Sequence, residues 1–545
     1  MLQLPFERWS LDAALDERVR LTPDAPFIRM IDGEPVSYAR MQADALALAH
    51  ALQQEGVRPG DRVVVMGANC HGTLRAWFAL NLLGATDVTI NTAYRGHTLE
   101  HAINTAEARL MLIEDRLLDV LRDSEAAVPK LKRVLHYSAE ESQSAKSMVA
   151  RFERLSLAPL PNATNAPAGW RPCGARPSDL ASIIFTSGTS GPAKGVMLPH
   201  AQTYLLSLES AQQMKVTERD IYYIFHPLFH MSPRYVGIYA ALIAGAQVCM
   251  DRTFSASGWL DRIRACGATV SIAHGPMLEM IHAEPVRPDD ADNPLQRFGT
   301  SPFPKHIAAS FEARFGVRGL EVWGMTEANI PIWSSLDEPL RPGSCGRPIG
   351  DHYELCIVDP ETDCEVAPGV TGELVVRSRL PWTLMQGYFG MPEATIKAWR
   401  NLWFHTGDLV YCDTEGYYHF VDRLGDRIRR RAENISSYDI EHAAMTCPDI
   451  SECAAVGVAS EFASDDDVKL VVVPRTDAAL DPVALLTHLA KRLPHYMVPR
   501  YIEIVDALPR TPTNKVRKAL LREAGVSKQT WDRKIAGVAL KSLVG

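Results

Sequence analysis

The sequence predicts an α/β fold with a large N-terminal part and a small C-terminal α+β domain. Helical and strand patterns alternate through most of the first 317 residues, short strands with turn signals fill residues 343–420, and a compact α+β pattern follows. Such alternation is typical of parallel sheets covered by helices. We expect two parallel-type subdomains, a β-rich subdomain and a boundary near Asp422, which gives domains 1–421 and 422–545.

The first elements follow from local patterns. Residues 37–55 carry apolar side chains at helical spacing, and a Pro-Gly-Asp turn at 59–61 ends that helix. The Val-rich segment Arg62 to Met66 predicts a short buried strand. A second helix is expected around residues 72–83 and a second strand around 85–90, which completes a β-α-β rhythm.

The middle of the chain contains a connection and a buried helix. The polar, Pro- and Ala-rich residues 138–177 predict a surface connection, and the strand at 181–185 opens the next unit. Residues 235–250 form the most apolar stretch, but it is shorter than the roughly 18–20 residues that a membrane span needs. We expect a buried helix that turns at Gly245 into a strand.

The C-terminal region has its own pattern. Residues 423–431 are strongly basic, and about 120 residues are enough for an independent small domain. Its expected elements are a helix at 438–445, strands at 452–458 and 469–473, a helix at 482–493 and a strand at 501–505.

Composition excludes several classes of protein. The 545 residues are 46% hydrophobic and 22% charged, with a net charge of −8, which excludes a disordered or fibrous chain and makes a nucleic-acid binder a poor candidate. The ten cysteines show no C-x-x-C spacing, and the first ten residues contain no apolar signal segment. We therefore expect reduced thiols, a cytoplasmic location and no stable membrane span; a homodimer is the expected assembly.

One loop carries a clear chemical signal. A β-branched strand ends in a run of hydroxyl residues and glycines with one lysine: Thr186, Ser187, Gly188, Thr189, Ser190, Gly191 and Lys194. Glycines let backbone N–H groups approach an anion, hydroxyls add neutral donors and the lysine adds a charge, so the loop fits a polyphosphate. A Walker A loop is excluded, because Ala193 precedes the lysine and Gly195 follows it. The alternative is a Gly/Ser-rich surface loop.

With this loop, a series of motifs resembles the adenylate-forming superfamily, which comprises acyl-CoA synthetases, peptide-synthetase adenylation domains and luciferases. The resemblance covers nearly the whole chain, and the loop around Phe298 is most similar to the crotonobetaine/carnitine–CoA ligase branch. The other motifs stand in the family's order: Trp323-Gly-Met-Thr-Glu327, Thr371-Gly-Glu-Leu374, Gly387-Tyr388, Trp403-Phe-His-Thr-Gly-Asp408, Asp422-Arg423, Glu433-Asn434 and Pro509-Arg-Thr-Pro-Thr-Asn-Lys515.

The resemblance implies an ATP-dependent carboxylic acid–CoA ligase of carboxylic or fatty acid metabolism. The acid attacks the α-phosphate of ATP and releases pyrophosphate, and the CoA thiol then attacks the acyl-adenylate and releases AMP. Because catalysis of this kind is mostly positioning and charge stabilisation, no Ser-His-Asp set is needed. The implied small molecules are ATP, Mg²⁺, coenzyme A and a carboxylic acid.

The resemblance also implies nucleotide contacts. The loop from Thr186 to Lys194 would hold the β- and γ-phosphates, while Thr326 would bond the α-phosphate and Glu327 would hold Mg²⁺. The remaining implied nucleotide residues are Trp323 and Gly324 beside adenine, Asp408 and Arg423 on the ribose, and the catalytic Lys515 between the acid and the α-phosphate. The small domain would swing about a hinge near Asp422 between the two half-reactions.

The acyl and CoA sites are less sharply specified. His230 resembles a family histidine near the acyl entrance, although a satisfied core histidine is the alternative. The other acyl candidates are Tyr235, His274, Gly275, Pro276, Met277, Asn329 and Ile330, and their apolar and aromatic character suggests a partly apolar acid. The CoA candidates are Arg430, Arg431, Glu433 and Asn434.

The CoA loop departs from the family. Where CoA ligases usually have Gly-Gly-Glu-Asn, this chain has Arg431-Ala432-Glu-Asn, and the added Cβ atoms restrict the backbone. Two alternatives therefore stay open: an adenylating ligase that passes the acyl group to an amine or a carrier-protein thiol, and a nucleotide-binding protein with degenerate chemistry.

Overall fold

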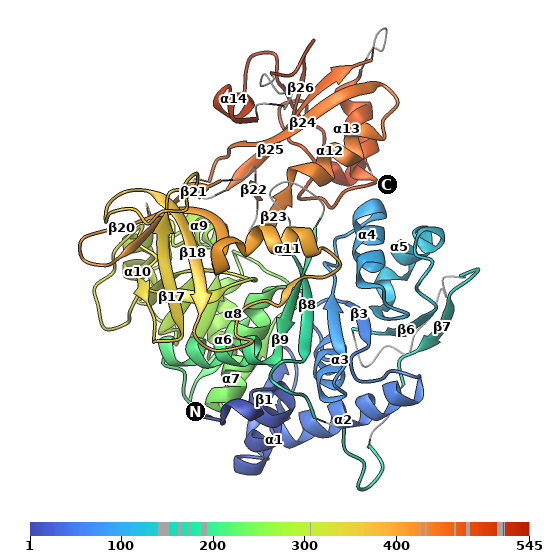
Figure 1. Cartoon of the computed structure of the whole chain (residues 1–545), viewed down its shortest axis with the longest axis vertical. Coiled ribbons are helices and arrows are strands. Elements are labelled where there is room, and N and C mark those ends of the chain that lie inside the picture. The colour runs from blue at the N-terminus through green and yellow to red at the C-terminus, as the bar shows by residue number, and fades with distance from the viewer. Residues whose placement is uncertain are drawn as a thin grey trace. The chain divides into compact units, whose positions relative to one another are not determined.

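The computed structural model divides the chain into two compact units (Figure 1). Met1–Thr92, Ile103–Phe185 and Gly195–Asp422 form the large unit, and Ala93–Ala102, Thr186–Lys194 and Arg423–Gly545 form the small unit. The structure describes residues 1–139, 152–161, 165–172, 174–186, 193–305, 307–424, 427–430, 433–462, 465–475, 480–509, 516 and 518–543.

Sheet 1 is the larger of two mostly parallel sheets. Its interior strands, from β14 to β1, run parallel to one another, and the outer strands β15, β16 and β2 are antiparallel to their neighbours. The strand order among the described residues is β16 (Arg347–Pro348), β15 (Asn329–Trp333), β14 (Arg318–Met325), β13 (Arg297–Thr300), β12 (Val270–Ala273), β10 (Ile221–Ile224), β11 (Gln247–Met250), β1 (Pro26–Met30) and β2 (Val36–Ser37). The carboxyl ends of β10, β12, β13 and β14 therefore meet at one edge.

Sheet 2 is the second mostly parallel sheet. In the described part of the chain its order is β19 (Gly387–Tyr388), β9 (Lys194–Pro199), β8 (Leu180–Thr186), β4 (Thr86–Thr89), β3 (Arg62–Met66), β5 (Leu110–Glu114), β6 (Arg133–Tyr137) and β7 (Ser156–Pro159). Strand β3 pairs parallel with β4 and β5. These two sheets confirm the predicted α/β class.

Sheet 3 is the predicted β-rich subdomain. It consists of β17 (Tyr353–Val358), β18 (Gly372–Ser378), β20 (Phe404–Cys412) and β21 (Tyr418–Arg423) within the described residues. Strand β18 pairs antiparallel with both β17 and β20, and Figure 1 shows β17 and β18 side by side. The antiparallel pairing agrees with the short strands and turn signals of residues 343–420.

Helices connect these strands. Those that precede the small unit's main segment are α1 (Leu11–Leu21), α2 (Tyr38–Gln54), α3 (His71–Leu82), α4 (Gly96–Ala106), α5 (Leu118–Asp123), α6 (His200–Gln213), α7 (Ala240–Ala244), α8 (Trp259–Cys266), α9 (Gly275–Ala283), α10 (Ala308–Phe315) and α11 (Pro392–Ala398). Helix α2 begins at Ser37, whose Oγ accepts the backbone N–H of Arg40 at 3.2 Å, as expected for an N-cap.

The most apolar stretch folds as predicted, with one addition. A π-helical segment, η4 (Ser232–Tyr239), leads directly into α7, and Gly245 then turns the chain into β11 with a φ of +87°. The side chain of Arg18 donates to the carbonyls of Leu242 and Ile243 at 2.9 and 2.7 Å and so caps the helix. A glycine is required at the turn, because a Cβ there would lie 2.7 Å from that guanidinium.

A buried ion pair fastens η4 to sheet 2. The guanidinium of Arg234 lies 2.7 Å from the carboxylate of Asp87 and donates to Ser182 Oγ at 3.0 Å, and both charged side chains are almost fully buried. It also lies 4.1 Å from the centre of the Trp77 ring. Removing either partner would leave an unpaired buried charge, which is strongly destabilising. The ion pair therefore holds η4 against sheet 2.

The small unit has an α+β core. A hairpin of β22 (Arg427–Arg430) and β23 (Glu433–Ser436) precedes a sheet ordered β24 (Ile450–Ala459), β25 (Asp466–Pro474), β26 (Tyr501–Ile504) and β27 (Trp531–Asp532) in the described residues. Its helices are α12 (Ser437–Met445), α13 (Pro482–Ala490) and α14 (Lys518–Glu523). The predicted helices and strands of this region are present, with shifts of a few residues.

Two features differ from the sequence-based expectation. The connection at 138–177 contains the edge strand β7, which pairs parallel with β6 through a four-residue stretch too short to give a periodic signal. The π-helical geometry of η4 was also not predicted. Among the residues that the structure describes, no helix combines the length and the apolar character needed to cross a membrane.

Candidate active site

The carboxyl edge of sheet 1 gathers most of the predicted residues of the large unit. His226 and His230 follow β10, His274 follows β12, Ser301 follows β13, and the Trp323–Glu327 segment lies at the end of β14. Ligands of open α/β sheets bind at the carboxyl ends of the strands. We call this set of strand ends the carboxyl edge.

A buried tryptophan–aspartate pair stands at one side of the edge. The indole Nε1 of Trp323 donates to Asp408 Oδ2 at 3.0 Å, and both residues are buried. The sequence predicted an aromatic face beside adenine; the structure adds that the indole orients the carboxylate. The indole N–H takes one of the roughly four acceptor positions of this carboxylate.

The Thr-Gly-Asp element positions that carboxylate through its backbone. Gly407 has a φ of +70°, which favours glycine, and its N–H donates to Glu373 Oε1 at 2.9 Å. The N–H of Asp408 donates to Thr406 Oγ1 at 3.1 Å, while that hydroxyl donates to the carbonyl of Leu374 at 2.6 Å. The three residues thus form a tight turn within β20 that aims the aspartate at Trp323.

The turn between β14 and β15 holds Thr326 and Glu327. Gln202 of α6 donates to the carbonyl of Thr326 at 3.0 Å, and Tyr388 donates through its hydroxyl to Glu327 Oε1 at 3.1 Å. Gly324 is needed at this turn, because a Cβ would lie 2.4 Å from the carbonyl oxygen of Asn329. The predicted α-phosphate and Mg²⁺ residues therefore lie together in one hairpin turn, with Thr326 partly exposed and Glu327 buried.

The donor set fits a magnesium ion that takes most of its ligands from a nucleotide. Within the described residues, no group of three or more His, Cys, Asp or Glu side chains is arranged to hold a metal ion. Mg²⁺ is usually bound by one or two carboxylates together with substrate phosphates and water. The single buried carboxylate of Glu327 matches that pattern.

Asn329 is the start of a buried hydrogen-bond chain. Its backbone has a φ of +59°, and its Nδ2 donates to the Tyr353 hydroxyl at 3.1 Å. Tyr353 donates to Glu209 Oε2 at 2.8 Å, and His352 Nδ1 lies 2.9 Å from the other carboxylate oxygen. Burial raises the pKa of Glu209, whose hydrogen bond in turn raises the pKa of His352. The predicted acyl residue is thus locked in place from behind.

Three histidines converge at the edge, and one of them was not predicted. The ring of His226 packs against Phe225 at a centroid distance of 4.6 Å and meets His274 edge-to-face at 4.7 Å. Burial is the main reason why the pKa of His226 lies well below its ordinary value, and the neighbouring His274 and His230 lower it further. This imidazole is therefore neutral. His226 immediately precedes the Pro-Leu-Phe-His segment, but the sequence gives no sign of its burial.

The other acyl candidates lie in different surroundings. Tyr235 is fully buried in η4, against Trp77 at a centroid distance of 5.8 Å, and belongs to the core between the sheets. Met277 packs against the hydrophobic cluster on the other face of sheet 1, and Ile330 is buried in β15. At Gly275 a Cβ would lie 3.2 Å from the carbonyl of Pro302, so the helix α9 begins in close contact with the neighbouring strand end.

The small unit contains the remaining candidates. Thr186 ends β8 and Lys194 begins β9, while Arg423 ends β21 and Glu433 and Asn434 open β23. The predicted Ser187, Gly188, Thr189, Ser190, Gly191, Arg431 and Lys515 lie outside the described residues.

The side chain of Arg430 lies inside the small unit rather than at its surface. Its side chain is buried, donates to the carbonyl of Val498 at 3.1 Å and lies 3.4 Å from the carboxylate of Asp467. Strand alternation in β22 explains this, because Ile428 and Arg430 share the inward face. The expected contact of Arg430 with CoA therefore has no support from its side-chain placement.

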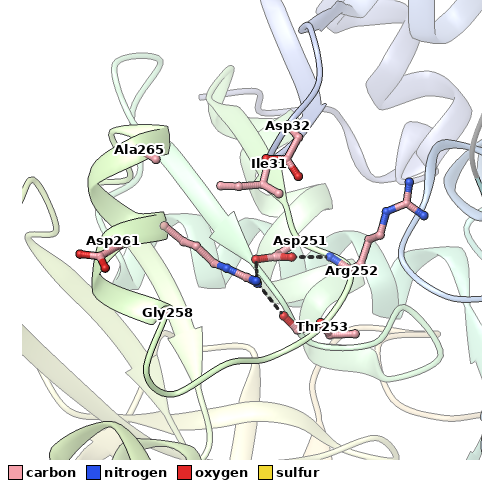
Figure 2. Close-up of a pocket in the computed structure, with 9 residues that line it drawn as sticks. Ile31, Asp32, Asp251, Arg252, Thr253, Gly258, Asp261 and Ala265 are labelled. Carbon is pink, nitrogen blue, oxygen red and sulfur yellow. Dashed lines mark hydrogen bonds and ion pairs between the residues drawn. The ribbon is translucent and has the colours of Figure 1, made fainter. Parts of the chain in front are cut away.

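A cavity of about 490 Å³ lies beside the strand ends of β1 and β11 (Figure 2). Asp251 stands at its centre, where it pairs with Arg262 and accepts the backbone N–H of Arg252 at 2.7 Å. Asp32 and Asp261 also line it, so the lining residues include three acidic and two basic side chains. With no excess of positive charge, this cavity lacks the electrostatic character of a phosphate site.

The fold is that of an α/β enzyme, and comparison with known proteins identifies its class and family. The AMP-binding enzyme model matches residues 15–389, and the model of the AMP-binding enzyme C-terminal domain matches residues 439–515. The chain belongs to the AMP-binding enzyme family. Its class is that of ATP-dependent, AMP-forming ligases that join a carboxylic acid to CoA through an acyl-adenylate.

Individual relatives agree with this class. The feruloyl-CoA synthase of an Amycolatopsis species is 30% identical over 93% of this chain and 97% of its own length. The crotonobetaine/carnitine–CoA ligase of Salmonella typhi is 28% identical over 89% and 93%, respectively, which bears out the branch suggested by the sequence. The structure is also similar to an amide bond synthetase from Marinactinospora thermotolerans, with a TM-score of 0.78, 25% identity and coverage of 94% of this chain and 99% of that one.

Proposed function

We propose that the carboxyl edge of sheet 1 binds the adenylate and the acid of this ligase, with a partly apolar carboxylic acid as substrate. The observation that supports this is the pairing of two fixed carboxylates with the β14 turn. Asp408 is oriented by Trp323, and Glu327 is oriented by Tyr388. Glu327 follows β14, and Asp408 reaches Trp323 of β14 from β20 of sheet 3, so both carboxylates lie beside the end of β14.

The reaction needs positioning more than covalent chemistry from the protein. A carboxylate oxygen forms a bond to the α-phosphorus while the bond to the β-phosphate oxygen breaks, and pyrophosphate leaves. The CoA sulfur then bonds to the acyl carbon, the bond to the AMP oxygen breaks, and the thiol proton passes to solvent. Mg²⁺, when bound, supplies charge stabilisation to the phosphates.

The individual roles follow the chemistry of the side chains. In this proposal Asp408 accepts the ribose hydroxyls, Thr326 donates to the α-phosphate and Glu327 holds Mg²⁺. Lys515 places its ammonium between the attacking carboxylate and the α-phosphate, where it stabilises negative charge in the transition state. The remaining proposed contacts come from the small unit's segments: the loop of Thr186, Ser187, Gly188, Thr189, Ser190, Gly191 and Lys194 on the outer phosphates, and Arg423 on the ribose.

The small domain, residues 422–545, is proposed to move about Asp422 between two poses. One pose brings Lys515 to the α-phosphate, and the other brings Glu433 and Asn434 to the incoming thiol. Such double use of domain closure separates the two half-reactions.

For the molecule that accepts the acyl group, a specific alternative to CoA exists. CoA is supported by the reaction class, whereas Arg431 and Ala432 replace the usual glycine pair, and an amide bond synthetase is among the proteins of similar structure. An amine acceptor is therefore the second candidate. Product analysis of the acyl-adenylate reaction with CoA, an amine or a carrier protein distinguishes them.

Lys515→Ala tests the scheme directly. We expect acid-dependent ATP–pyrophosphate exchange to fall by about 10²–10³-fold, the usual loss for one transition-state donor, while thiol transfer from supplied acyl-AMP persists. Lys528→Ala, outside the proposed site, is the control and should exchange normally. Equal loss of both half-reactions in Lys515→Ala would contradict the two-pose scheme.

A further inference from the structure

His226 is a buried polar side chain that makes no hydrogen bond through its ring to any residue that the structure describes. It is 1% exposed, and neither ring nitrogen has a hydrogen-bond partner among the described residues. Most buried side-chain polar atoms have such a partner, because an unmet donor or acceptor is costly. At the proposed substrate site, the missing hydrogen-bond partner of this imidazole can come from the ligand.

The backbone around His226 is rigidly held. Asn69, at the start of α3 on the sheet 2 side, donates through Nδ2 to the carbonyls of His226 and Asp251 at 2.8 and 2.9 Å. Its Oδ1 accepts the N–H of Leu228 at 2.9 Å. Asn69 is itself buried, so one side chain from the neighbouring subdomain fixes the residues on either side of Pro227. The backbone that carries the imidazole is thereby fixed, and the ring itself packs against Phe225 and His274.

The imidazole also has a defined chemical form. Because burial keeps His226 neutral, one of its nitrogens donates and the other accepts. His274 covers it edge-to-face and is itself only partly buried, with Nδ1 lying 3.4 Å from the carbonyl of Ser301. A neutral donor–acceptor pair suits a hydroxyl group, which can also donate and accept, whereas a second carboxylate on the acid could only accept.

The position of His226 in sheet 1 places this contact far from the reacting carboxylate. Strands β14, β13, β12 and β10 are consecutive, so the end of β10 lies three strand spacings from the Trp323–Glu327 turn. At roughly 4.8 Å per spacing this is about 14 Å along the edge. A group bound there belongs to the end of the acid remote from its carboxyl.

We propose that His226 is a specificity-determining residue that hydrogen-bonds a hydroxyl at the distal end of the carboxylic acid, with His274 covering the contact. This inference rests on the proposed function of the carboxyl edge and narrows its substrate to acids that are apolar along their length and hydroxylated at the far end. Asn69 acts as a positioning residue for this contact.

The test uses matched pairs of acids in ATP–pyrophosphate exchange by the full-length enzyme. The pairs are 4-hydroxycinnamic and cinnamic acid, and 8-hydroxyoctanoic and octanoic acid. The wild-type enzyme should prefer the hydroxylated member of at least one pair by about 10–100-fold in kcat/KM, since a buried polar group left unpaired by the deoxy acid penalises it.

Variants separate recognition from structure. His226→Leu should abolish the preference by losing the hydroxylated acid and retaining the deoxy acid, and His226→Gln should recover part of it because an amide also donates and accepts. The control is His50→Leu on α2, which should leave the ratio unchanged. The melting temperature of His226→Leu should not fall far below wild type, because the ring makes no hydrogen bond to a described residue that the substitution would remove.

Two results would overturn the inference. One is exchange with acids but equal kcat/KM for both members of every pair; the other is a His226→Leu enzyme that keeps the wild-type ratio or loses both members equally. Failure of the wild-type enzyme to exchange with any acid would instead refute the proposed function of the edge, so the two failures are distinguishable.

Discussion

Replacing Asp408 by asparagine removes one charge at the edge without changing the size of the side chain. The amide oxygen can still accept the indole N–H of Trp323, now 3.0 Å from the carboxylate, so the turn should hold. What is lost is the charged acceptor for the ribose hydroxyls. Hydrogen bonds to charged groups contribute about 1.5–3 kcal/mol, which corresponds to an increase of about 10–150-fold in the ATP concentration required.

The assay is acid-dependent ATP–pyrophosphate exchange measured over a range of ATP concentrations. We expect the KM for ATP to rise in Asp408→Asn while the KM for the acid changes little, because the substitution lies at the nucleotide end of the edge. Asp337→Asn is the matched control: that carboxylate is exposed and pairs with Lys215 at 2.6 Å. Unchanged ATP dependence in Asp408→Asn, with normal folding, would refute the ribose assignment.

Two other substitutions in the large unit have defined outcomes. Tyr388→Phe removes the hydroxyl that donates to Glu327 at 3.1 Å. In a Mg²⁺ titration of the exchange rate, the Mg²⁺ concentration for half-maximal exchange should therefore rise about tenfold. An unchanged titration would contradict the proposal that Glu327 holds Mg²⁺. Burial raises the pKa of Glu321 to about 8, so its protonated form favours the fold, and that stability is lost as pH rises from about 4.5 through 8. Glu321→Gln should remove this loss, on the order of 5 kcal/mol, and unfolding midpoints that fall equally with pH in both proteins would contradict it.

Much of the fold could be predicted because its signals are local. Periodicity predicts the Val-rich strand Arg62–Met66 and the helix α2. Gly245 indicates a turn, because glycine is favoured where the backbone has a positive φ. The edge strand β7 and the π-helical geometry of η4 could not be predicted, since both depend on pairing and packing with distant segments.

The site was predictable where residue type determines chemistry. Asp408 and Glu327 were predicted from their motifs; the structure places Glu327 at the end of β14, on the same edge as His230 and His274, and Asp408 on β20 of sheet 3, where it contacts Trp323. Their orienting partners were not foreseen, because the Trp323–Asp408 bond joins segments 85 residues apart.

The burial of Arg430 and His226 could not be predicted, and the reason is the same for both. Arg430 looked like a surface cation in a basic run, but strand alternation turns it inward to Asp467. His226 looked like an ordinary neighbour of the Pro-Leu-Phe-His segment, and only the folded chain shows that its ring nitrogens are buried without partners among the described residues. Burial is a property of tertiary packing, and composition or spacing in one sequence does not determine it.

The most direct test of the account is a crystal structure with a hydrolysis-resistant acyl-adenylate, such as an acyl-sulfamoyl adenosine. We predict that the ribose hydroxyls lie within hydrogen-bond distance of Asp408, that the sulfamate, which replaces the phosphate, lies beside Thr326, and that the acyl chain runs along the ends of β13 and β12 toward His226. An analogue bound with full occupancy away from the carboxyl edge of sheet 1 would contradict the central claim.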